Sequence, residues 1–335
     1  MFVPDDDVVA GPLTAAPFRP PVLPPEIPGA RALRGLSYAT PAGFRELKLD
    51  LFIPTTAQGR HASGEGSVAG AAGSRLAEGP FDTILFIHGG GFLTGDRAWV
   101  PDSWEQGELF AQMIARGYAV ASMDYRHICE GTFPAQFHDT RAAIRYLRLY
   151  AADLGLSGRI VAWGESGGSI LASHTAVVPP GSTIEGWDFE GLIGAPGQGS
   201  GLAAAVLWYG VSTRSMFAGF SANEAAGSEK YPDGWLVDAV KGWAGEPLDR
   251  TNPAAVAQDL TAFLGPANPP MLLIHGLNDN VVPCAMSRAF AQKAQRRGAD
   301  LRYTEIPGAG HWFKGVPVGP IAEQSLDFLD EVLGR

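Results

Sequence analysis

The chain has 335 residues, 46% of them hydrophobic and 18% charged, and could form one large domain. Its formal net charge is −10 and it has no dense run of Lys or Arg, so neither nucleic acid nor an anionic membrane surface is expected as a partner. No uncharged apolar run reaches about 18 residues, so no membrane-spanning helix is expected.

The N-terminal segment, residues 1–35, is predicted to be an extended arm because it is dense in proline, with Pro-Pro pairs at 20–21 and 24–25. Such an arm could wrap the domain or reach a neighbouring subunit, which leaves a homodimer open. Three consecutive aspartates, at 5–7, stand where a secretory signal would need positive charge. We therefore expect a cytoplasmic protein.

The first strands are expected at 36–38 and 46–53, the second of which alternates between polar and apolar residues as a half-exposed strand does. A stretch rich in Gly, Ala and Ser at 55–79 predicts a loose loop. The next strand, at 83–87, ends in the sequence His-Gly-Gly-Gly-Phe at 88–92. A backbone with so few side chains can approach a ligand closely.

Helices are expected between the later strands. Pro134 stands at a favourable helix start, and the apolar residues that follow recur at three- and four-residue steps as far as Leu154. The same periodicity places Arg145 and Arg148 on the outward face. Because strands alternate with helices, the sheet should be mainly parallel and the fold should belong to the α/β class.

A serine flanked by glycines follows the buried strand predicted at 160–163. In Gly164-Glu165-Ser166-Gly167-Gly168 the serine would lie on a cramped turn from strand to helix, which pushes its Oγ out of the sheet and leaves no space for flanking side chains. The pattern predicts a nucleophile. It also arises by chance in a chain with 43 glycines, so the prediction depends on the residues that accompany it.

Two later loops supply the partners that a serine nucleophile needs. A predicted strand at 271–276 leads to Asp279, and a predicted strand at 301–306 leads through a glycine-bearing loop to His311. Catalytic groups gather at the carboxyl ends of the strands in open α/β sheets, so Ser166, Asp279 and His311 are expected to meet there. They would act as nucleophile, orienting acid and general base in acyl transfer.

With this order of serine, acid and histidine, and with a His-Gly-Gly-Gly loop ahead of the serine, the chain resembles the HGGG-type carboxylesterases of the α/β-hydrolase superfamily. These include hormone-sensitive-lipase-like and feruloyl-esterase-like bacterial esterases. The resemblance implies an α/β-hydrolase domain over residues 36–335, with a mostly parallel sheet, flanking helices and a small cap inserted at about 212–268. It also implies cleavage of a small-molecule carboxylic ester through an acyl-enzyme.

The expected oxyanion hole consists of the backbone N–H groups of Gly90, Gly91 and Gly167, which would stabilise the negative charge of the tetrahedral intermediate. Many relatives have alanine at the position of Gly167. The substrate-binding residues are expected to be Phe92, Glu165, Tyr209, Val211 and Trp312. Further candidates for the acyl pocket come from the apolar residues of the cap, namely Met216, Phe217, Phe220, Trp235 and Trp243.

Neither a metal nor an organic cofactor is expected, because the seven histidines are scattered and no zinc or nucleotide motif occurs. The only cysteines, Cys129 and Cys284, are expected to be separate thiols. His275, at the end of a predicted strand, is expected to make a structural hydrogen bond rather than to take part in catalysis.

Two alternatives stay open. The triad does not distinguish an oxygen from a nitrogen leaving group, so an amidase or formamidase of the same fold is one of them. The other is a noncatalytic small-molecule-binding protein, as in the plant gibberellin receptors, which resemble this family but have lost the catalytic histidine. The presence of His311 argues against that second alternative, although fold alone does not settle function. The acyl preference is also open.

Overall fold

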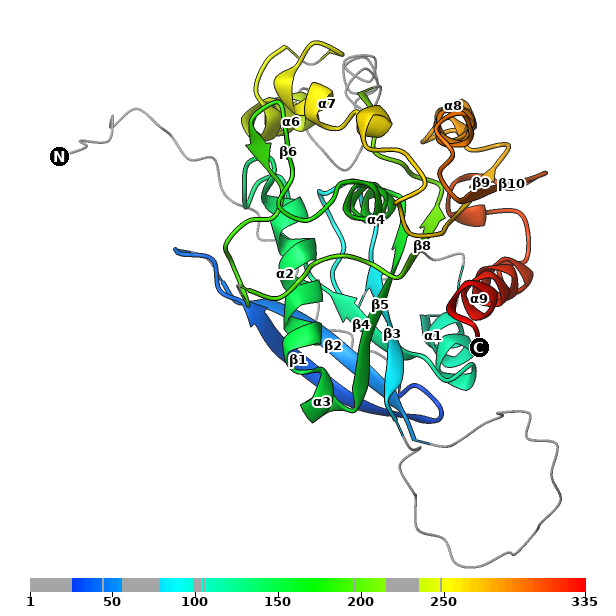
Figure 1. Cartoon of the computed structure of the whole chain (residues 1–335). Helices are drawn as coiled ribbons and strands as arrows, with labels where there is room; N and C mark the ends of the chain where they lie inside the picture. The colour runs from blue at the N-terminus through cyan, green and yellow to red at the C-terminus, as the bar shows by residue number, and fades with distance from the viewer. Residues whose placement is uncertain are drawn as a thin grey trace, which may run out of the picture.

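A central sheet of eight strands, in the order β1-β2-β4-β3-β5-β8-β9-β10, organises the molecule (Figure 1). The computed structural model describes residues 26–43, 45–55, 79–98, 104, 106–195, 197–214, 235–247 and 249–335. The strands of the sheet are β1 (Ala30–Ala39), β2 (Leu47–Pro54), β3 (Phe81–Ile87), β4 (Ala119–Met123), β5 (Leu156–Glu165), β8 (Ala204–Trp208), β9 (Met271–Gly276) and β10 (Leu301–Ile306).

In this sheet β4, β3, β5, β8, β9 and β10 pair with one another in parallel. The exception is β2, which pairs antiparallel with both β1 and β4. A small antiparallel hairpin, β6 (Thr183–Ile184) and β7 (Trp187–Asp188), stands apart from this sheet. The described helices are α1 (Gln106–Ala115), α2 (Ala135–Leu149), α3 (Ala151–Leu154), α4 (Gly167–Val177), α6 (Trp235–Ala244), α7 (Pro253–Ala257), η3 (Leu260–Ala262), α8 (Cys284–Arg296), η4 (His311–Phe313) and α9 (Gly319–Leu333).

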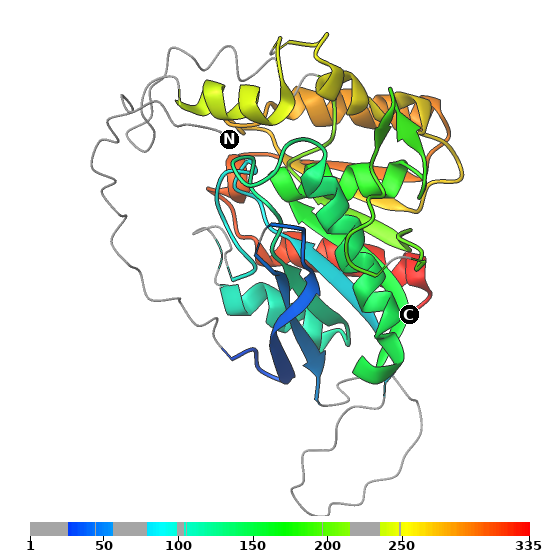
Figure 2. The same cartoon turned by 90° about the vertical axis from the view of Figure 1, so that its left-hand side faces the viewer.

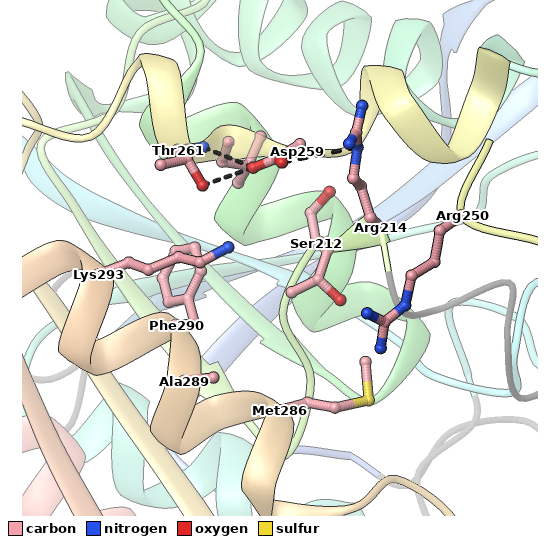
Figure 3. Close-up of a pocket in the computed structure, with 11 residues that line it drawn as sticks. Ser212, Arg214, Arg250, Asp259, Thr261, Met286, Ala289, Phe290 and Lys293 are labelled. Atoms are coloured by element: carbon pink, nitrogen blue, oxygen red, sulfur yellow. Dashed lines mark hydrogen bonds and ion pairs between the residues drawn. The ribbon is translucent and has the colours of Figure 1, made fainter. Parts of the chain in front are cut away.

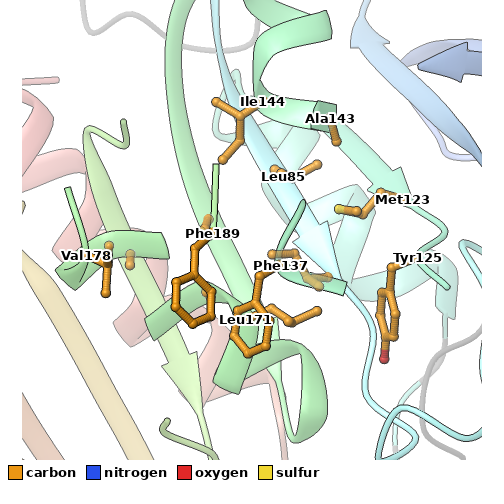
Figure 4. Close-up of a cluster of buried hydrophobic side chains, with 14 of the residues drawn as sticks. Leu85, Met123, Tyr125, Phe137, Ala143, Ile144, Leu171, Val178 and Phe189 are labelled. Carbon is orange, nitrogen blue, oxygen red and sulfur yellow. The ribbon is translucent and has the colours of Figure 1, made fainter. Parts of the chain in front are cut away.

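Helices cover both faces of the sheet, so each face has its own hydrophobic core. One core packs α2 and α4 against the sheet through residues such as Phe137 and Leu171 (Figure 4). The other packs α1 and α9 against the opposite face through residues such as Phe110 and Leu329. Strands buried on both faces are rich in apolar residues, which is why the sequence pattern identifies β3 and β9. The predicted α/β class is confirmed.

Helices α6, α7 and α8 lie at the same end of the molecule in both views (Figures 1 and 2). This is the end at which β8 finishes, because residues just after β8 share a cavity with residues of η3 and α8. The segment that follows β8 therefore lies at this end, beside η3 and α8. Residues 215–234 of the predicted cap, with Met216, Phe217 and Phe220, lie outside the described residues, as do 1–25 of the predicted arm and 56–78 of the predicted loop.

Two local predictions were wrong. The first strand begins at Ala30 rather than at Leu36, so the end of the predicted arm belongs to the sheet. Arg145 does not face outward but is buried. Its guanidinium donates hydrogen bonds to Glu190 Oε1 at 2.5 Å and to the carbonyl of Ile193 at 2.7 Å. A charged side chain can be buried when it is paired in this way.

Candidate active site

Ser166 occupies a strained turn between β5 and α4. Its backbone has φ 50° and ψ −117°, a conformation that a residue with a Cβ rarely adopts. The turn is held from the side of β8, since the Ser166 N–H donates to the carbonyl of Trp208 at 3.0 Å and Ser169 Oγ donates to the carbonyl of Gly210 at 2.5 Å. Ser166 is therefore presented at the end of the sheet where β5 and β8 finish.

Glycine is required on both sides of this turn. A Cβ on Gly164 would strike the backbone of Gly168, and a Cβ on Gly168 would strike the carbonyl groups of Ile87 and His88. Because the obstructing atoms are backbone, no side-chain rotation can relieve the clash. The glycine spacing read from the sequence is thus a packing requirement between β5, α4 and the end of β3.

The glycine loop after β3 lies directly against the start of α4. Gly90 and Gly91 have positive φ values of 90° and 62°, which glycine adopts without strain. A Cβ on Gly167 would lie 3.2 Å from Gly91 N, so the two segments are in close contact. Within the described part of the chain, the backbone N–H groups of Gly90, Gly91 and Gly167 have no hydrogen-bond acceptor. They are free to donate to a bound oxygen atom.

Glu165 lies beneath the glycine loop and supports it. Its side chain is fully buried, and Oε1 accepts a hydrogen bond from the Gly89 N–H. Tyr125 fixes the next peptide of the loop by donating to the Gly89 carbonyl at 2.8 Å. Burial raises the pKa of Glu165 to about 8, although hydrogen bonding from Gly89 and Tyr209 opposes the rise. Oε2 has no hydrogen bond of good geometry among the described residues. The predicted substrate contact is thus a support of the loop.

Ser166, His311 and Asp279 come together as the sequence predicts, although they belong to three separate loops. Ser166 Oγ lies 3.1 Å from His311 Nε2, and His311 Nδ1 lies 2.7 Å from Asp279 Oδ2. The other oxygen of Asp279 accepts from the backbone N–H groups of Val281 at 2.9 Å and Val282 at 2.8 Å. Burial tends to raise the pKa of Asp279, but hydrogen bonds from His275 and His311 lower it well below its usual range.

His275 is a further partner of Asp279. Its Nε2 lies 3.1 Å from Asp279 Oδ2 and 3.0 Å from the carbonyl of Val282, so this nitrogen must carry the proton. Nδ1 then accepts from the Ser287 hydroxyl at 2.7 Å. The expectation of a structural hydrogen bond is confirmed, but the sequence did not show that the bond would be to Asp279. The only signal was the spacing of four residues between the two.

The remaining predicted substrate-binding residues differ in how deeply they are buried. Tyr209 is buried with its ring 5.0 Å from the His311 ring, and Val211 is buried two residues further on. Phe92 packs 5.6 Å from Trp243, which places one predicted cap aromatic in the core beside the glycine loop. Trp312, directly after His311, is 37% exposed. Of the predicted contacts it is the one that faces solvent.

Cys129 and Cys284 are free thiols, as predicted. Within the described ranges, no group of three or more His, Cys, Asp or Glu side chains is arranged to hold a metal ion. Among the same residues, no helix is both long enough and apolar enough to cross a membrane.

A family model described as BD-FAE matches residues 74–294, which include Ser166 and Asp279. Esterase LipC of Mycobacterium tuberculosis is 27% identical over 273 residues, covering 76% of this chain and 59% of LipC. The chain spans about half the length of several other curated relatives that it matches.

Solved structures of esterases share the fold. A truncated carbohydrate esterase from gut microbiota is 23% identical, with a TM-score of 0.70 over 93% of this chain and 99% of that one. Esterase 2 of Thermogutta terrifontis in its butyrate-bound form is 26% identical, with a TM-score of 0.59 over 92% of this chain and 95% of that one. These likenesses confirm the predicted α/β-hydrolase fold.

Proposed function

Because the chain belongs to the BD-FAE family, we propose that it is a serine esterase that cleaves carboxylic esters through an acyl-enzyme. The observation that carries the proposal is the series of hydrogen bonds from Ser166 Oγ through His311 to Asp279, at 3.1 and 2.7 Å. At these distances a hydroxyl proton can pass to the imidazole during attack. LipC and the Thermogutta terrifontis enzyme are both named as esterases, which agrees with the proposed activity.

In the first half of the reaction, Ser166 Oγ attacks the ester carbonyl while His311 Nε2 accepts its proton. Nε2 must be unprotonated for this step, which requires that Nδ1 carry the proton and donate a hydrogen bond to Asp279. The Asp279 carboxylate, ionised at neutral pH because its pKa is lowered, then stabilises the imidazolium. His311 returns the proton to the leaving alcohol, and water releases the acid by the same route.

The oxyanion of each tetrahedral intermediate would be held by the N–H groups of Gly90, Gly91 and Gly167. Their lack of acceptors among the described residues supports this assignment, as does the contact between the glycine loop and the start of α4. Donors that are fixed before the reaction cost no reorganisation when the charge develops, and loss of one such donor typically lowers kcat by roughly 10²- to 10³-fold. Glu165 and Tyr125 would keep the donors in place.

The test is hydrolysis of p-nitrophenyl esters of increasing acyl length by the native protein, Ser166→Ala, His311→Ala and His138→Ala. His138 is a matched control, since its described ring hydrogen bond is to the carbonyl of Asp188, away from the triad. We expect the first two substitutions to lower kcat at least ~10³-fold and the control to leave it unchanged. An unchanged rate in Ser166→Ala would overturn the proposal, and faster cleavage of matched anilides would indicate an amidase.

A further inference from the structure

A cavity of about 230 Å³ lies between residues 212–214, which follow β8, residues 250–261, and α8 (Figure 3). Of the described residues that line it, three are cationic, Arg214, Arg250 and Lys293, and one is a carboxylate, Asp259. The α8 residues of the lining are spaced at three- and four-residue steps, from Met286 to Lys293, so one face of the helix forms this wall. The proposed triad does not line it.

The carboxylate of Asp259 already has hydrogen-bond and ion-pair partners. Its Oδ1 accepts from the N–H of Thr261 at 3.1 Å and from the Thr261 hydroxyl at 2.5 Å, while Oδ2 lies 3.7 Å from Arg214 Nε. Burial tends to raise the pKa of Asp259, but the bonds from Thr261 and the charges of Lys293 and Arg214 lower it. Asp259 therefore stays ionised and is committed to Thr261 and Arg214.

Arg250 and Lys293 have no such partner. Neither makes an ion pair with a carboxylate of the described residues, and both side chains point into the cavity from opposite walls (Figure 3). Two cations that face the same cavity repel each other, and an anion between them would remove the repulsion. The chain as a whole carries a net charge of −10, so a cationic cavity is a local arrangement and not a general property of the surface.

Both walls of the cavity continue into the loops of the candidate active site. Gly210, which packs on the Ser166 carbonyl, is two residues before Ser212, and two Cα–Cα steps span at most about 8 Å. On the other wall, α8 carries Ser287, which bonds to His275 and through it to Asp279. The cavity therefore adjoins the segments that hold Ser166 and Asp279.

We propose that this cavity binds an ionised carboxylate carried by the ester substrate, held between Arg250 and Lys293. The inference rests on the proposed function and names its substrate class: esters with a second, free carboxylate, such as half-esters of short dicarboxylic acids. Water occupies about 30 Å³ per molecule in the liquid, so 230 Å³ holds the equivalent of roughly seven or eight waters. That volume admits a short acid chain. Thr213 adds a neutral donor, since its Oγ1 is buried without a partner among the described residues.

The test compares monoethyl glutarate with ethyl pentanoate, two esters of similar length of which only the first has a free carboxylate. The selectivity ratio, kcat/KM for the anionic ester over that for the neutral ester, is measured for the native protein, Lys293→Gln and Arg250→Gln. We expect each substitution to lower this ratio about tenfold, mainly through KM of the anionic ester, and the native preference to weaken with added salt. Equal thermal midpoints would show that the variants fold.

Arg296→Gln is the matched control, because Arg296 is an exposed residue of α8 outside the lining. It removes the same charge from the same helix and should leave the ratio unchanged. If Arg296→Gln lowered the ratio as much as Lys293→Gln, the effect would belong to the overall charge and the inference would be overturned. It would also be overturned if the native protein cleaved both esters by a Ser166-dependent route and the ratio did not respond to Lys293 or Arg250.

Calorimetric titration of the Ser166→Ala protein with glutarate gives a readout that needs no turnover. Weaker glutarate binding in Lys293→Gln and Arg250→Gln would support a carboxylate site even if the proposed esterase activity failed. Inorganic phosphate is the second probe. Phosphate binding that depends on Lys293 and Arg250, with no binding of glutarate, would overturn the carboxylate assignment.

Discussion

The carboxyl group of Glu165 is fully buried directly before Ser166, and the described residues place no cation beside it. It accepts a hydrogen bond from the Gly89 N–H, which fixes the glycine loop. A carboxyl without a counter-charge favours its protonated form when water is removed, which is why its pKa rises to about 8. The residue that supports the loop is therefore neutral over most of the physiological range.

This burial predicts a specific pH dependence for Glu165→Gln. The unfolded chain releases the Glu165 proton near pH 4.5, whereas the folded chain holds it to about pH 8. Between these values the folded state binds more protons, so the native protein loses stability as pH rises through the window. Gln keeps an acceptor for Gly89 but does not titrate.

The quantity to compare is the free energy of unfolding of Glu165→Gln minus that of the native protein. This difference should be larger at pH 8 than at pH 5 by more than about 1 kcal/mol, which corresponds to one pKa unit. Urea unfolding of both proteins at the two pH values measures it. A difference that stays constant with pH would show that Glu165 is ionised in the folded protein throughout.

At the scale of elements, the turn from β5 to α4 should be the least tolerant part of the sheet. We expect Gly168→Ala to lower the free energy of unfolding by at least about 2 kcal/mol, because its Cβ would overlap the carbonyl groups of Ile87 and His88. The same overlap would displace Ser166, so kcat should fall as well. Thermal unfolding and ester hydrolysis provide the two measurements.

Gly242→Ala is the control for the intrinsic effect of the substitution. Gly242 is an exposed position within α6, and a Cβ there has no described atom within 4 Å. Since alanine favours helix by about 1 kcal/mol over glycine, this variant should be as stable as the native protein or more so. If Gly168→Ala behaved like Gly242→Ala, the turn would have to be more adaptable than its close contacts indicate.

The elements that the sequence predicted best are those that one local pattern defines. Short apolar runs identified β3 and β9, and the glycines around Ser166 identified the turn into α4. Arg145 was misplaced because helical periodicity reports its position on α2 but not its partner Glu190, 45 residues away. The start of β1 was missed because its residues alternate irregularly between exposed and half-buried.

The same limit applies to the candidate site. Ser166, Asp279 and His311 could be predicted because each follows a recognisable strand, and parallel strands bring their carboxyl ends together. The roles of Glu165 and His275 could not. The glycine loop that Glu165 supports is distant in the chain, and the spacing of four residues between His275 and Asp279 does not by itself predict a hydrogen bond. The cationic cavity was also missed, since Arg250 and Lys293 come from segments that only the folded chain brings together.

At the scale of the whole molecule, two cores on opposite faces of one sheet share the stability, whereas the candidate site depends on the loops at one end. Leu329 tests this separation, because it is fully buried on α9 in the core that faces α1. Ser166, His311 and Asp279 take their described hydrogen bonds from other segments. Packing of α9 should therefore affect the free energy of unfolding but not the kcat or KM of the folded protein.

Leu329→Ala should lower the free energy of unfolding by about 2–5 kcal/mol, the range for truncating a buried leucine, and shift the urea midpoint without changing the slope. In the absence of urea, kcat and KM should stay at native values. Glu323→Ala, an exposed position on the same helix, should change neither. A loss of kcat in Leu329→Ala at temperatures where it is fully folded would mean that α9 positions the loop of His311 through the sheet. The site would then depend on both cores and not on its loops alone.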